Sequence, residues 1–110
     1  MCVGTQIAEP TDVQVERAVD TLKLLADPTR LRILWALLHG EHAVGELAEH
    51  VGTPAPAVSQ HLAKLRLAHL VQTRRDGNRI YYLADDDHVR KLAEVALFHA
   101  GAPGQVGRTA

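Results

Sequence analysis

Hydrophobic residues recur with the period of an α-helix along most of this chain of 110 residues. Between Val13 and Ala26 they stand at positions 15, 18, 19, 22, 25 and 26, which form one stripe on a helix. Asp27 and Pro28 interrupt that stripe, and a proline fits the first turn of a new helix. The pattern therefore predicts one helix up to Ala26 and a second over residues 28–39.

Three further helices and one hairpin are predicted after these two. Short helices are expected over residues 43–51 and from 54 to about 69, with Gly52 as a stop between them. The period changes in VQTRRDGNRIYYL, residues 71–83, where two β-prone runs flank the turn residues Asp-Gly-Asn. Such a sequence predicts a β-hairpin. The last helix is predicted over residues 84–100.

Composition indicates one small globular domain. Hydrophobic residues make up 46% of the chain and charged residues 23%. We expect the domain over residues 13–100, between a flexible arm (1–12) and a flexible tail rich in glycine and proline (101–110). No apolar run approaches the ~20 residues of a membrane span, and no signal peptide is recognisable. The single cysteine, Cys2, allows no internal disulfide, and we expect a cytoplasmic protein.

The charges are unevenly distributed, although the net charge of −1 by itself argues against a nucleic-acid partner. Residues 55–82 hold five cations and one acid, Asp76, whereas residues 1–20 hold four acids and one cation, Arg17. A local basic face of this kind can attract DNA even in a nearly neutral chain. The alternative is an ordinary solvated surface. The five cations are Lys64, Arg66, Arg74, Arg75 and Arg79.

Two short helices followed by a basic hairpin form the pattern of a winged helix-turn-helix, a mainly helical fold with a small β-hairpin. Its second helix, called the recognition helix, enters the major groove of DNA, and the first side chains of that helix reach the base edges. Here these side chains are Ser59, Gln60 and His61. Glutamine can form two hydrogen bonds with adenine. Lys64, one turn on, and the other four cations would contact phosphates. Alternatively, Ser59 and Gln60 are ordinary exposed residues of a helix start.

Two histidines of the last predicted helix, His88 and His99, lie on nearly the same face. The eleven residues between these positions advance a helix by about 1100°, which is three turns and about 20°. They also separate the histidines by about 16.5 Å along the axis, whereas a zinc–nitrogen bond is only about 2 Å long. Two antiparallel copies of the helix could bring His88 of one chain to His99 of the other. Such a site would require a dimer and would occur in it twice.

Four segments resemble one protein family: LLADPTRLRILWAL, VGELAEHVG, AVSQHLAKLRLAHLV and RRDGNRIYYL. They are similar to the ArsR/SmtB family of bacterial metal-responsive repressors, and the likeness covers about residues 13–100. The resemblance implies a homodimer formed by the first and last helices, with operator DNA as its partner. It also implies that metal binding releases the DNA.

Two classes of metal site occur in that family. One class uses cysteines just before the recognition helix, where this chain has Ala43 and Gly45. The resemblance therefore implies no soft-metal site at this place, and we expect the nearby His42 and His50 to be surface residues. The other class uses the last helix, with an Asp-x-His sequence at its start and a further histidine near its end.

This second pattern is present in Asp86, His88 and His99. The resemblance implies a site formed by Asp86 and His88 of one subunit and His99 of the other. In pattern it is closest to the zinc or nickel/cobalt sensors of actinobacteria. Nitrogen and oxygen ligands suit a divalent zinc, nickel or cobalt ion, so we expect one of these metals as the effector.

The ligand set is incomplete, because Ala102 stands where the family has a fourth ligand and alanine cannot coordinate a metal. Asp85, Asp87 or Cys2 could complete the site. Alternatively, the acids near the helix start only complement the helix dipole, His99 is a cation of the last turn, and Cys2 has no role.

The expected function is therefore a metal-responsive transcriptional repressor that binds an inverted-repeat operator as a dimer. Three alternatives remain at this stage. The protein could be a repressor that senses another small molecule or nothing, a plain dimerisation module, or an enzyme. We do not expect an enzyme, because the chain offers no candidate pair of nucleophile and base.

Overall fold

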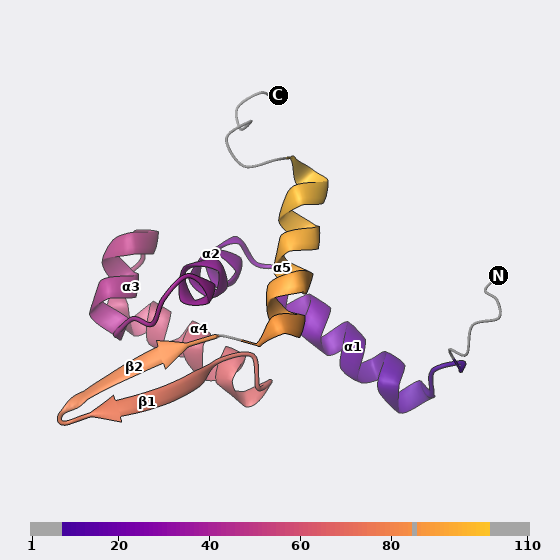
Figure 1. Ribbon diagram of the computed structural model, residues 1–110, viewed down its shortest axis with the longest axis horizontal. Coiled ribbons are helices and arrows are strands. Elements are labelled where there is room, and N and C mark those ends of the chain that lie inside the picture. The colour runs from indigo at the N-terminus through magenta and orange to yellow at the C-terminus, as the bar shows by residue number, and fades with distance from the viewer. Residues whose placement is uncertain (1–7, 85, 102–110) are drawn as a thin grey trace.

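The computed structural model describes residues 8–84 and 86–101, which form five helices and one β-hairpin (Figure 1). The arrangement confirms the predicted winged helix-turn-helix. Cys2, Asp85 and Ala102 lie outside the described residues, as do most of the expected arm and all of the expected tail except Gly101. In chain order the elements are α1 (Asp12–Leu25), α2 (Pro28–Leu38), α3 (Val44–Val51), α4 (Ala55–Leu67), β1 (Gln72–Asp76), β2 (Arg79–Leu83) and α5 (Asp87–Ala100).

Two helix ends differ from the prediction by two or three residues, each for a local reason. α5 begins at Asp87 rather than Ala84, because the Asp86 carboxylate accepts hydrogen bonds of 2.7 and 3.3 Å from two backbone N–H groups of the first turn. Asp86 is therefore the N-cap of α5. α4 ends at Leu67, because His69 adopts a left-handed backbone conformation with φ 61°.

Side chains also define the starts of α1 and α2. Thr11 and Gln14 form a capping box, in which each side chain accepts a hydrogen bond from the other residue's backbone N–H, at 3.1 and 2.9 Å. Asp27 caps α2 by accepting from the backbone N–H of Arg30 at 2.9 Å, and Pro28 occupies the first turn. The Asp-Pro interruption seen in the sequence is thus the junction between two helices.

The hydrophobic core lies around α2, which packs against α1, α3, α4, α5 and β2. Each large aliphatic side chain that is fully buried contributes roughly 1.5–3 kcal/mol. α1 contributes no buried residue, and α1 and the C-terminal half of α5 project away from the body in Figure 1. Core members include Ile33, Leu34 and Leu37 of α2, Leu47 of α3, Val58, Leu62 and Leu65 of α4, and Val89 and Ala93 of α5.

The hairpin is fixed to the body by a backbone bridge. β1 and β2 pair antiparallel, and the turn between them includes Gly77, whose φ of 65° favours glycine. Just before α3, the backbone of His42 donates to Tyr82 O at 3.0 Å and accepts from Tyr82 N at 2.8 Å. The β1–β2 hairpin, which is the wing of this fold, is therefore held against the start of α3. The helix that follows α3 is α4, the recognition helix.

Candidate DNA-binding surface and metal site

The recognition helix α4 exposes the polar side chains that the sequence predicts to bind DNA. Its apolar residues Val58, Leu62 and Leu65 are buried in the core and so fix the rotation of the helix about its axis. Four of the predicted DNA-contacting residues are then exposed, and α4 itself contains no acid. This surface can approach phosphates and base edges without charge repulsion from its own helix. The four residues are Ser59, Gln60, Lys64 and Arg66.

His61 is placed differently from its neighbours on α4. It is half-buried at the edge of the exposed face, and its Nδ1 lies 3.2 Å from a guanidinium nitrogen of Arg30. Arg30 also donates through Nε to Leu24 O at 2.6 Å. The sequence does not predict this junction, because residues 30 and 61 are far apart in the chain and only the packing of α2 on α4 brings them together.

The wing arginines already make contacts within the free protein. Arg74 donates to a Glu41 carboxylate oxygen at 2.8 Å, and this hydrogen bond raises the pKa of Arg74. The guanidinium groups of Arg74 and Arg79 lie 4.9 and 5.3 Å from the centre of the Tyr81 ring, at distances typical of cation–π contacts. Arg75 reaches Gly77 O at 3.5 Å near the wing tip. All three arginines are exposed, so they remain accessible to a phosphate backbone.

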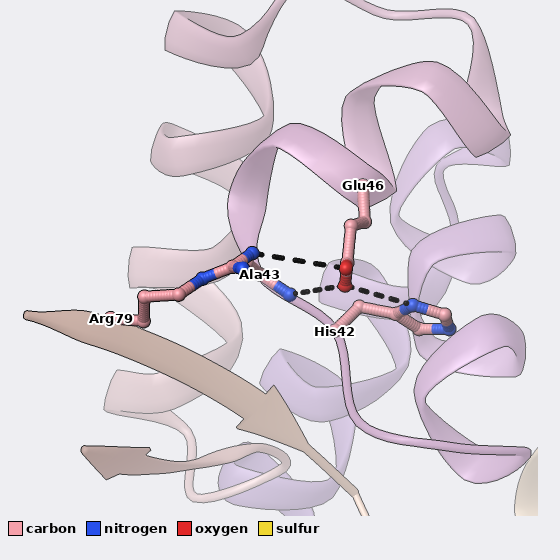
Figure 2. Close-up of polar contacts among 4 residues, drawn as sticks. All are labelled: His42, Ala43, Glu46 and Arg79. Atoms are coloured by element: carbon pink, nitrogen blue, oxygen red, sulfur yellow. Dashed lines mark hydrogen bonds and ion pairs between the residues drawn. The ribbon is translucent and has the colours of Figure 1, made fainter. Parts of the chain in front are cut away.

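Glu46 connects the wing to the start of α3 (Figure 2). One carboxylate oxygen accepts from Ala43 N at 3.0 Å and lies 3.5 Å from His42 Nδ1, while the other is 3.8 Å from Arg79. The backbone hydrogen bond is the main reason why the pKa of Glu46 lies below its ordinary value. His50 is exposed as expected, whereas His42 is half-buried, with its ring stacked 6.4 Å from that of His50.

The three candidate metal ligands do not meet within one protomer. Asp86 and His88 lie together at the start of α5, with 3.5 Å between Asp86 Oδ1 and His88 Nδ1, whereas His99 lies in the last turn. Within the part of the chain that the structure describes, no three His, Cys, Asp or Glu residues are close enough to hold a metal ion. The pKa of the Asp86 carboxyl lies below its ordinary value, chiefly because the carboxylate accepts a hydrogen bond from the backbone N–H of His88. Capping alone therefore accounts for an acid at this position.

Exposed apolar side chains gather on the two helices that project from the body. On α5, Val95 is 68% exposed and Phe98 is 47% exposed. At about 100° per residue, His88, Val95 and His99 fall within about 40° of one another around the helix. On α1, the predicted stripe remains 41–54% exposed at Val15, Val19 and Leu22. Both candidate histidines therefore share a helix face with Val95, which has no core to enter, and Phe98 is exposed about 80° around the helix from His88.

Comparisons with known proteins agree with this fold. Residues 27–73 match the family described as bacterial regulatory proteins of the arsR family. The HTH-type transcriptional regulator KmtR of Mycobacterium tuberculosis is 54% identical over 93 residues, which cover 84% of this chain and 72% of KmtR. The cadmium resistance transcriptional regulatory protein CadC homolog of Staphylococcus aureus is 31% identical over 117 residues and 97% of each chain.

A solved structure matches the described fold over nearly its whole length. It is the homodimeric winged helix-turn-helix DNA-binding domain of a possible ArsR-family regulator from Mycobacterium bovis. The two chains share 28% identity with a TM-score of 0.76, over 94% of this chain and 99% of that one. Within residues 8–84 and 86–101, every helix is too short or too polar to span a bilayer. The family match and the identity with KmtR show that the chain belongs to the ArsR family of DNA-binding transcriptional regulators, which is a regulator family and not an enzyme family.

Proposed function

We propose that this regulator is a metal-responsive repressor. It binds an inverted-repeat operator as a homodimer and leaves it when zinc, nickel or cobalt binds between the subunits. The observation that carries the proposal is the exposed apolar face of α5, which bears His88 and His99 near its two ends. Such a face needs a partner, and an antiparallel partner would supply the missing ligands.

The dimer is supported by the exposure of α1 and α5. Apolar side chains that stay in water lose the stabilisation of roughly 25 cal/mol per Å² that burial provides. The stripes of both helices point away from the core, and the Mycobacterium bovis domain is homodimeric. In a symmetric dimer the two copies of α4 would enter successive major grooves about 34–36 Å apart, which requires an inverted-repeat operator.

DNA contact is assigned to α4 and to the wing. Ser59 and Gln60 are exposed near the start of α4 and can meet base edges there. His61 lies at the edge of the same surface. The remaining contacts are cations that would neutralise phosphates and fix the register of the protein on the duplex, namely Lys64, Arg66, Arg74, Arg75 and Arg79.

The donor atoms of α5 fit a borderline divalent metal. Asp86 can keep its capping bonds through Oδ1 and offer its second oxygen, and the His88 side chain is 97% exposed. With His99 of the partner subunit they form an N₂O set, which suits zinc, nickel or cobalt. The bound metal would supply the free energy that favours one arrangement of the subunits over another. Asp87, which is exposed next to the site, is a further candidate ligand, as are Asp85 and Cys2.

The second candidate function is a dimeric ArsR-family repressor that does not sense metal. It is favoured by one observation, that Asp86 is already explained as the N-cap of α5. In that case His88 and His99 are surface residues at the rim of the dimer interface, and the effector is another small molecule or none.

A metal titration on DNA-bound protein separates the two candidates. The probe is a duplex that the protein selects from a randomised pool, and its anisotropy is followed as zinc, nickel or cobalt is added. We expect two ions per dimer and release of the duplex. His99→Ala should bind the duplex with unchanged affinity and no longer respond to metal, whereas His50→Ala, which removes an exposed histidine of α3, should respond fully. Release that persists in His99→Ala would contradict the proposed site.

A further inference from the structure

One hydrogen-bonded junction connects α1, the central helix α2 and the recognition helix α4. Its centre is Arg30, near the start of α2, which is half-buried. Its Nε donates to Leu24 O in the last turn of α1 at 2.6 Å, and a terminal nitrogen lies 3.2 Å from His61 Nδ1. The backbone N–H of the same residue is bound by Asp27 at 2.9 Å. Three separate segments are thus held by one side chain and its own backbone.

The chemistry of this contact determines the state of the imidazole. A guanidinium group only donates hydrogen bonds, so His61 Nδ1 must accept. In this arrangement the N–H of the ring is on Nε2. His61 lies next to Gln60 on the side of α4 that is proposed to face DNA. A ring held in this way offers a fixed N–H donor beside the base-reading residues.

We propose that Arg30 is a positioning residue for DNA recognition, which acts by fixing the tautomer and orientation of His61 and by linking α4 to the end of α1. The inference rests on the proposed DNA-binding surface and adds to it a residue of α2 that does not touch DNA. Because Arg30 is half-buried and already bonded on two sides, its cation is committed to the protein rather than to phosphate. Loss of Arg30 should therefore weaken the reading of sequence more than the attraction to DNA in general.

The test compares two duplexes and two variants. One duplex is selected by the wild-type protein from a randomised pool, and the other is a random duplex of equal length. Arg30→Met should weaken binding to the selected duplex about tenfold, as expected if a misplaced His61 loses one hydrogen bond to DNA. Binding to the random duplex and the salt dependence should stay unchanged. Arg32→Met, which removes an exposed cation of the same helix, is the matched control and should leave the ratio of the two affinities unchanged.

A double-mutant cycle locates the effect. In a His61→Ala background the substitution Arg30→Met should change the affinity ratio no further, because its partner is gone. In His61→Asn, whose side-chain oxygen can take the place of Nδ1 as the acceptor, Arg30→Met should again lower the ratio. Effects that simply add in the His61→Ala background would overturn the proposal. Arg30→Lys, which keeps the cation without the planar fork, repeats the test with a smaller perturbation if Arg30→Met does not fold.

Two further outcomes are distinguishable. If Arg30→Met weakens binding to both duplexes equally, and the slope of log affinity against log salt concentration falls by about one, Arg30 contacts a phosphate directly and the inference is wrong. If the wild-type protein enriches no sequence from the pool, the proposed repressor function fails at that first step, and the inference fails with it.

Discussion

The substitution Phe98→Ala tests whether the exposed face of α5 is the dimer interface. An aromatic side chain can bury about 200 Å², and 47% of Phe98 remains exposed in the protomer. About 90 Å² per protomer would therefore leave water on dimerisation, which at roughly 25 cal/mol per Å² contributes about 2 kcal/mol. Both protomers lose this contact in the variant, so the dimer should weaken by about 4 kcal/mol, or roughly a thousandfold in its dissociation constant.

Sedimentation equilibrium over a range of protein concentrations measures that constant directly. The matched control is Ile80→Ala, because Ile80 is 40% exposed but lies on the wing rather than on α1 or α5. The dissociation constant of the dimer should be unchanged in Ile80→Ala and strongly increased in Phe98→Ala. The affinity of Phe98→Ala for a duplex with two half-sites should fall in parallel. An equal response of the two variants would show that general hydrophobicity, and not the α5 face, holds the subunits together.

The side chains that cap α2, α3 and α5 can each be tested by one substitution. Asp27→Ala should lower the free energy of unfolding in urea by about 1 kcal/mol at neutral pH. Because the Arg30 N–H holds the pKa of Asp27 below its ordinary 3.8, the difference from wild type should persist above that pH and vanish as pH falls further. Glu46→Gln keeps an acceptor for Ala43 N–H but releases Arg79, so filter binding should show a few-fold gain for DNA of any sequence. Asp86→Asn should leave the thermal unfolding temperature unchanged, because asparagine caps a helix as well as aspartate, yet it should lower the metal affinity measured by calorimetry.

Hydrophobic periodicity located the helices to within a few residues, because a helix that packs through one face carries its apolar residues at the helical period. It could not show where a stripe is buried. Val15, Val19 and Leu22 have the spacing of core residues, yet about half of each remains exposed in the protomer. A stripe that meets its own core and a stripe that stays at the surface have the same pattern, so only the three-dimensional structure distinguishes them.

The polar contacts of the site were beyond reach of the sequence for a different reason. Arg30 with His61 and Arg74 with Glu41 join residues 31 and 33 positions apart. No local rule relates such positions, and their proximity depends on how α2, α4 and the wing pack. Asp86 shows the opposite case, because a cap and a metal ligand call for the same residue at the same place. Local sequence predicts its position without deciding its role.

The packing of α2 favours a rigid protomer as the unit that responds to an effector. At its N-terminal end α2 is tied through Arg30 to α1 and α4, and at its C-terminal end Leu38 O accepts from Arg90 of α5 at 2.5 Å. α5 meets the rest of the protomer chiefly through α2. A metal bridging α5 to a partner subunit would therefore have little freedom to deform one protomer internally. Its effect would be to rotate whole protomers and so change the spacing of the two copies of α4, to which an inverted repeat is sensitive.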